Sequence, residues 1–121
     1  MNKILCNSVE YVFLREVNSF ENGIPVLNTG VSWKKLQVLE KPVYSTSIEQ
    51  SDAGVSNKES ISAVTRYNQE EPLLKYSQLY VILRLKTDQE TFIVGSENYP
   101  VLAEIDSDKI ESMYHFSRTS A

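Results

Sequence analysis

The sequence predicts a single mostly-β domain, an antiparallel β-sandwich or small barrel that carries one long polar hairpin. Three observations support this. Several short segments are rich in β-branched and aromatic residues or alternate apolar with polar residues. Gly, Pro, Asn and Asp separate these segments, as turns require. No stretch shows the sustained 3.6-residue apolar period of an amphipathic helix. An α+β domain with one or two short helices is the alternative.

Size and composition set the outer limits. A chain of 121 residues corresponds to one domain over 1–121. Its net charge of −4, spread evenly, argues against nucleic-acid binding. The single cysteine, Cys6, excludes an intrachain disulfide. The apolar run before it is too short for a signal peptide, and no window is long enough to span a membrane. We expect a cytoplasmic protein, or one assembled into a virion-like particle.

The N-terminal third is predicted to contain three extended segments. Residues 10–15 suit a buried strand because they are aromatic and β-branched. Asn22-Gly23 predicts a turn, and residues 24–27 an edge segment because Pro25 has no N–H for a central ladder. Residues 32–39 predict a strand, with a short helix as the alternative.

The middle of the chain predicts a protruding hairpin over residues 43–67. Residues 43–50 and 60–67 are both rich in Ser, Thr and β-branched residues. A polar connection over 51–59, containing Gly54, joins them. Such a hairpin has little core of its own, and isolated hairpins are marginal in water. It lies either on the rim of a sheet or forms an arm that pairs with a neighbouring subunit.

The C-terminal half is predicted to supply most of the sheet. Residues 73–77 suit one helical turn, and 78–86 the strongest strand, because apolar residues alternate along it. A turn over 87–90 leads to a return strand over 91–94. A short helical turn over 106–109, capped by Asp106 or Ser107, precedes a closing strand over 111–118.

The stretch between residues 95 and 100 predicts a sheet corner. Gly95 tolerates a positive φ and ends a strand abruptly. Pro100 fixes its own φ and favours an extended conformation at Tyr99. A contact ledge for another subunit is the alternative interpretation.

Catalytic and metal chemistry find little support. Zinc needs several Cys or His ligands, and the chain has only Cys6 and His115. The run from Asp106 to Asp108 begins like a calcium loop but lacks the residues that must follow. We therefore predict no catalytic residue, metal or cofactor, and no enzymatic activity. A small enzyme built on Cys6 and His115 stays as a third hypothesis.

The segments 80–86, 92–101 and 50–54 resemble small structural proteins encoded in prophages of gut Bacteroides-type bacteria. The similarity covers roughly residues 43–118 and consists of strand patterning and turn chemistry, although the 86–90 turn lacks a Gly that the resemblance implies. It implies a tail or head–tail joining component, with no catalytic motif.

The leading functional prediction is a non-enzymatic structural subunit of a phage or prophage-derived particle, forming homo-oligomers and contacting other particle proteins, without binding nucleic acid or membrane. A ligand- or glycan-binding β-sandwich that uses Trp33 and Tyr44 is the alternative. The residues predicted for the assembly interface are Tyr44, Ile48, Gly54, Ile61, Val64, Tyr67, Tyr99 and Pro100.

Overall fold

The computed structural model describes residues 2–52, 54–75 and 79–120, and most of them lie in antiparallel strands. This confirms the mostly-β prediction. The main sheet consists of β1 (Asn2–Leu5), β2 (Ser8–Phe13), β5 (Lys34–Lys35), β6 (Val43–Ser51), β7 (Gly54–Arg66), β8 (Leu79–Lys86), β9 (Thr91–Val94), β10 (Val101–Ser107) and β11 (Glu111–Ser120). A small second sheet pairs β3 (Val17–Glu21) with β4 (Ile24–Leu27). The helical elements are η1 (Leu14–Glu16) and α1 (Pro72–Lys75).

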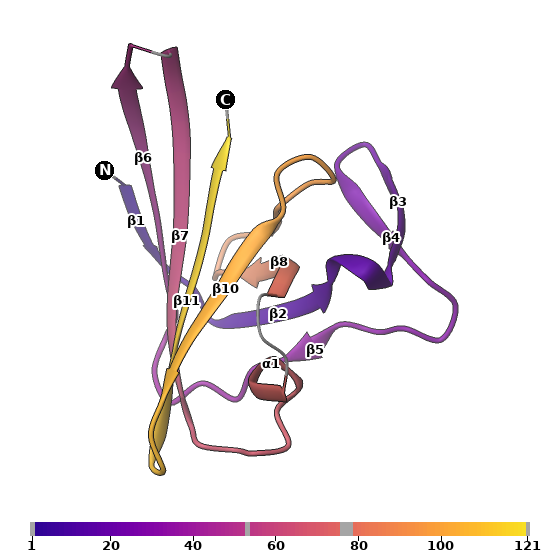
Figure 1. Cartoon of the computed structure of the whole chain (residues 1–121), viewed down its shortest axis with the longest axis vertical. Coiled ribbons are helices and arrows are strands. Elements are labelled where there is room, and N and C mark those ends of the chain that lie inside the picture. Colours follow the sequence, from indigo (N-terminus) through magenta and orange to yellow (C-terminus); the bar gives the residue numbers. More distant parts are fainter. Residues whose placement is uncertain (1, 53, 76–78, 121) are drawn as a thin grey trace.

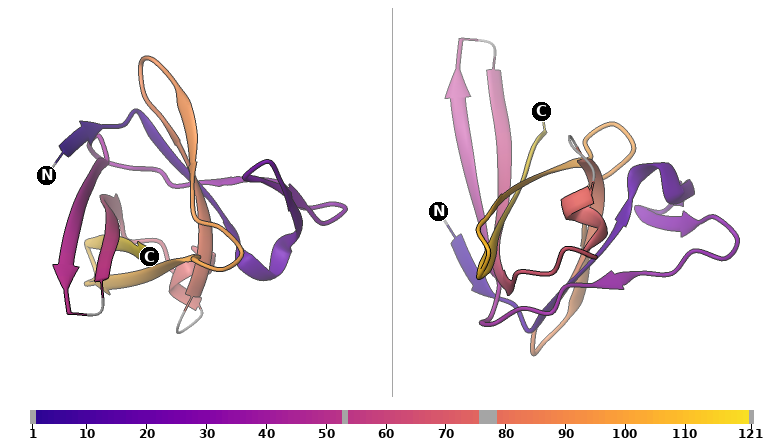
Figure 2. Two further views of the ribbon diagram at one scale, coloured as in Figure 1. Left: turned by 90° about the horizontal axis from the view of Figure 1, so that it is seen from above. Right: turned by 60° about the horizontal axis from the view of Figure 1, so that its bottom comes forward.

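The main sheet has the order β1-β6-β7-β11-β10-β8-β2-β5, with β9 paired to β8 beside β10. It curls strongly, so that β2 and β5 come round towards the opposite side from β6 and β7 (Figures 1 and 2). After β5, residues 36–39 cross between its two flanks. Leu36 donates its backbone N–H to Val9 at 3.1 Å, and Leu39 donates to Val64 at 2.8 Å. A closed barrel would need a full hydrogen-bonded ladder between these flanks. Among the described residues, the crossing segment makes only an isolated bridge to β7, between Val38 and Thr65.

The core fills the inside of this curl. Alternate residues of β7 and β11 point inward, so that Ile61 and Phe116 are fully buried while Ser62 and His115 face outward. The buried apolar cluster comprises Cys6, Val9, Tyr11, Phe13, Leu36, Ile61, Ala63, Leu73, Val81, Leu83, Leu85, Val94, Val101, Ala103, Tyr114 and Phe116. Most of it comes from strands that are remote from one another in the sequence.

The corner predicted between 95 and 100 joins β9 to β10. Both strands pair with β8: β9 along its second half and β10 along its first. Residues 95–100 therefore loop out between two strands that pair with successive parts of β8. Gly95 has a φ of +114°, and Ser96 donates its backbone N–H to Tyr99 at 3.1 Å. The loop between β9 and β10, which we term the β9–β10 corner, therefore interrupts the strand that pairs with β8.

Three element predictions were wrong. Of residues 32–39, only Lys34–Lys35 form a strand, because the chain then leaves β2 to cross towards β7. Residues 54–59 belong to β7 and are not a flexible connection. Residues 106–109 form no helical turn, since β10 extends to Ser107 and Asp108 caps a hairpin by accepting the N–H groups of Ile110 and Glu111.

The remaining boundaries differ by a few residues. The strand predicted over 10–15 is β2 over 8–13, followed by η1. The helical turn predicted over 73–77 is α1 over 72–75, and its last two predicted positions lie outside the described residues, as does position 78, the first residue of the strand predicted over 78–86. No helix in the described ranges is long and apolar enough to cross a membrane.

An ion pair between β2 and β8 makes stability depend on pH. Arg84 donates to both carboxylate oxygens of Glu10, at 3.1 and 2.9 Å, and stacks over Trp33. The hydrogen bonds from Arg84 lower the pKa of Glu10 against the opposing effect of burial. A lowered folded-state pKa stabilises the fold above the unfolded-state value, about 4.3, and this contribution disappears as the pH falls through the folded-state value.

We therefore expect the free energy of unfolding to fall below about pH 4.5, and to fall less steeply in Glu10→Gln. Urea unfolding followed by tryptophan fluorescence between pH 3 and 7 measures this. Parallel pH profiles for the two proteins would show that the Glu10 pair makes no such contribution.

Candidate functional site

The β6–β7 hairpin extends beyond its neighbours and forms the most prominent projection of the molecule (Figure 1). On one side, the described part of β1 reaches only as far as the pair Asn2–Thr46. On the other side, the described part of β11 ends at the pair Ser120–Asn57. Within the described residues, the outer edges of 47–51 in β6 and 55–56 in β7 therefore face no further strand. Their outward backbone groups are available to pair with another chain.

A polar network fixes the base of this hairpin. Arg118 of β11 donates to the Glu59 carboxylate at 2.6 Å and to the Tyr99 carbonyl at 2.9 Å. The other Glu59 oxygen accepts the hydroxyl of Tyr44 at 2.5 Å. The Tyr44 ring in turn meets Phe92 edge to face, with centroids 5.2 Å apart. Because these groups tie β6, β7 and β11 to the β9–β10 corner, the hairpin leaves the core in a defined direction.

Beyond the network, the two faces of the hairpin differ in chemistry. The face that carries Tyr44 continues with Ile48, which is 70% exposed, and with Val55, which is 54% exposed. Ile48 and Gln50 share this face with Tyr44 because side chains alternate along a strand. Val55 lies on it too because it pairs with Gln50 across the hairpin. The opposite face carries exposed Glu49 and Lys58. The hairpin end thus offers one face on which Ile48 and Val55 pair with the uncharged Asn57 and Gln50, and one charged face.

The residues predicted for an interface do not form one surface. Ile48 and Gly54 lie on the exposed part of the hairpin. Tyr44 is half-buried at its base, and Tyr99, which is 39% exposed, lies at the corner next to Pro100. Val64 and Tyr67 lie at and just beyond the opposite end of β7.

Ile61 corrects the prediction, because it is completely buried in the core and has no surface for a partner. Val55, Glu59 and Arg118 were not predicted. Val55 was missed because it falls in a segment that was interpreted as a loop; a strand pattern running through 54–59 is the signal that could have placed it.

The residues considered for catalysis do not come together. Cys6 is fully buried, and burial raises the pKa of its thiol, which disfavours the reactive thiolate. His115 is exposed on the outward face of β11. No group of three or more His, Cys, Asp or Glu residues in the described ranges has a geometry that could hold a metal ion.

No family model, curated protein or solved structure matches this chain.

The two aromatic residues considered for a glycan platform are each engaged within the chain. Trp33 is half-buried and lies under the Arg84 guanidinium, whose carbon is 4.6 Å from its ring centroid. Tyr44 is half-buried between Phe92 and Glu59. The Arg84 guanidinium therefore already occupies one face of the Trp33 ring. The hairpin, by contrast, presents its apolar side chains uncovered.

Proposed function

We propose that this protein is a non-enzymatic assembly subunit that associates with itself and with neighbouring proteins through the β6–β7 hairpin. The observation that carries the proposal is the exposure of Ile48 and Val55 on one face of a hairpin whose outer edges lack strand partners within the described residues. Scattered apolar residues are ordinary on protein surfaces. Here they coincide with backbone groups that can form intermolecular ladders.

The charged face and the polar base support the same proposal. Glu49 and Lys58 keep one face of the hairpin in water, which leaves the Ile48 face for contact. The Glu59–Arg118 network holds the arm in one direction, so less conformational entropy is lost when a partner binds. The resemblance to prophage structural proteins makes a phage or prophage-derived particle, in its tail or head–tail region, the proposed setting.

The experiment that tests the proposal compares surface substitutions of matched exposure. Ile48→Asp combined with Val55→Asp places charges on the contact face, and we expect association to weaken at least about tenfold, because each buried unpaired charge costs more than 1.4 kcal/mol. Ile110→Asp is the control, since Ile110 is 75% exposed and lies in the turn between β10 and β11. Light scattering on a sizing column across a concentration series measures association.

Equal association of the double variant and the control would contradict the role of the hairpin. A wild-type chain that stays monomeric at millimolar concentration would contradict self-association.

A further inference from the structure

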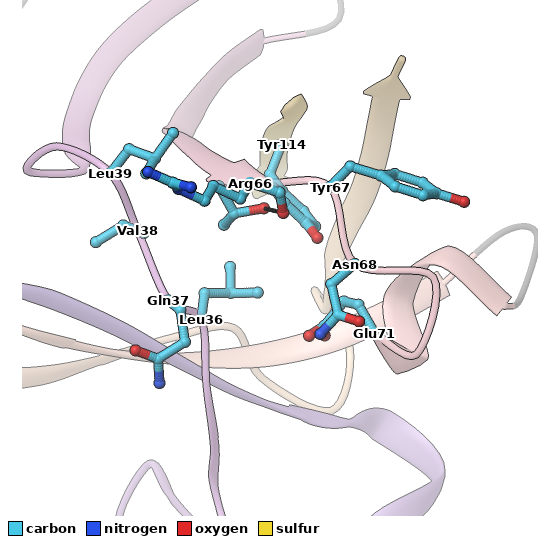
Figure 3. A pocket seen from close by; sticks show the side chains of 10 residues that line it. Leu36, Gln37, Val38, Leu39, Arg66, Tyr67, Asn68, Glu71 and Tyr114 are labelled. Atoms are coloured by element: carbon cyan, nitrogen blue, oxygen red, sulfur yellow. Dashed lines mark hydrogen bonds between the residues drawn. The ribbon is translucent and has the colours of Figure 1, made fainter. Parts of the chain in front are cut away.

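A pocket of about 380 Å³ opens at the end of β7 opposite the hairpin tip, between residues 36–39 and residues 65–71 (Figure 3). This volume lies within the range of small-molecule sites, about 300–1,000 Å³. None of the residues used in the proposed assembly contact lines it. Its lining combines an apolar wall with one acidic and one basic side chain.

The apolar wall comes from the segment that crosses between the flanks of the sheet. Leu36 is buried, Val38 is half-buried and Leu39 is 48% exposed. Hydrogen bonds from Leu36 to Val9 and from Leu39 to Val64 hold this segment at both ends. The wall is therefore fixed in position, and it can cover a short hydrocarbon chain.

The acidic end is the Glu71 carboxylate. Glu71 is half-buried and accepts the hydroxyl of Tyr11, a fully enclosed core residue. Burial, followed by the hydrogen bond to Glu71, raises the pKa of Tyr11 far above its ordinary value, so the phenol stays a donor. A carboxylate has about four acceptor positions, and the Tyr11 hydroxyl fills one. Asn68 fixes the loop that carries Glu71, because its carbonyl accepts the Glu71 N–H and its side-chain Oδ1 accepts the Glu70 N–H. Glu71 can therefore accept further donors from the pocket.

The basic end is Arg66, the last residue of β7. Its side chain is exposed, and no hydrogen bond or ion pair engages its guanidinium within the ranges 2–52, 54–75 and 79–120. Figure 3 shows the guanidinium beside Leu39, with Glu71 on the other side of Leu36 in that view. A guanidinium binds a carboxylate through two parallel hydrogen bonds. The pocket therefore separates a cation from an anion by apolar surface.

We propose that this pocket binds a small zwitterion whose ammonium and carboxylate groups are separated by an apolar segment. The ammonium donates to Glu71, the carboxylate accepts from Arg66, and the apolar segment covers the exposed side chain of Leu39. A fatty acid would leave Glu71 facing hydrocarbon, and a simple amine would leave Arg66 without a counter-ion. Both charges of the pocket therefore select against ligands that carry only one charge.

The test uses three probes of equal chain length: 6-aminohexanoate, hexanoate and hexylamine. Binding is measured by NMR titration of backbone amides, at a salt concentration near 50 mM because exposed charges are screened. We expect wild-type protein to bind 6-aminohexanoate about fivefold or more tightly than either other probe, since one charge-assisted contact contributes about 1–2 kcal/mol. The amides that shift should cluster at residues 36–39 and 65–71.

Substitutions assign each charge to one end of the ligand. Arg66→Gln should weaken the binding of 6-aminohexanoate and of hexanoate about fivefold but leave the affinity for hexylamine unchanged. Glu71→Gln should weaken the binding of 6-aminohexanoate and of hexylamine but should not weaken that of hexanoate. Lys58→Gln and Glu49→Gln, on the hairpin, are the charge-matched controls. Arg66 is exposed, so its variant tests the proposal even if Glu71→Gln perturbs folding.

Equal affinity for the three probes, insensitivity of 6-aminohexanoate binding to Arg66→Gln, or no shift at the pocket up to about 50 mM probe would overturn the proposal. Because the probes contact no hairpin residue, this outcome is independent of the assembly experiment.

Discussion

Replacement of Gly95 by alanine is expected to lower the free energy of unfolding by about 2–4 kcal/mol, the largest loss we expect from a single methyl group in this chain. Gly95 has a φ of +114°, which side chains other than glycine's rarely adopt. A Cβ atom there would stand 2.8 Å from Cδ1 of Ile82, and Ile82 is itself fully buried. Backbone strain and overpacking therefore act together.

Gly54→Ala separates these two causes. Gly54 has nearly the same φ, +119°, but a Cβ atom there would meet nothing within 4 Å. We expect Gly54→Ala to cost only the backbone component, about 1–2 kcal/mol. Urea unfolding of both variants, with the midpoint and the slope fitted together, measures the difference. Equal losses would show that Ile82 moves aside at no cost.

Glu59→Gln is expected to lower the free energy of unfolding by about 1–3 kcal/mol, because it leaves the Arg118 guanidinium without its ion-pair partner. The two side chains are only 18% and 17% exposed, so water compensates for little of the lost charge. The glutamine side chain keeps the shape of glutamate, and its amide oxygen can still accept from Arg118, but the contact with Tyr44 must then reverse, with the amide NH2 donating to the hydroxyl.

The loss should be strongest in the hairpin. Hydrogen exchange of amides in residues 44–51 and 54–60 should speed up more than exchange in β8. Glu49→Gln is the control, since Glu49 is exposed on the same hairpin. Uniform acceleration across the whole sheet, or an equal effect of Glu49→Gln, would contradict a specific role of the network at the hairpin base.

The strands were predictable where local pattern and tertiary environment agree. Residues 79–86 alternate strongly enough to identify β8, yet Ile82, which shares a face with the polar Arg84 and Lys86, is fully buried because it packs against Gly95. Residues 32–39 alternate as well, but only Lys34 and Lys35 form a ladder, and Val38 makes an isolated bridge. A pattern predicts an extended conformation, whereas the neighbouring strands decide whether a ladder forms.

The candidate sites were predictable only in part. Ile48 and Ile61 lie in similar Ser-rich surroundings, but one is 70% exposed and the other is buried. The difference comes from how far β6 and β7 extend past the described parts of β1 and β11. The pocket was not predicted at all. It forms because residues 36–39 cross from β5 to β7 and so reach residues 65–71, and no local pattern in the sequence indicates this crossing.

The topology of the main sheet also sets how the chain reaches its native state. β2 pairs with β8, so Val9 must find Leu85, and β1 must wait for β6. Only the β6–β7, β8–β9 and β10–β11 pairs of the main sheet join consecutive strands. Pairing of distant strands loses loop-closure entropy before the new contacts contribute any stabilisation. We therefore expect folding on the millisecond to second timescale. The hairpin is local and can form early, so its apolar face would be available to other chains before the core is complete.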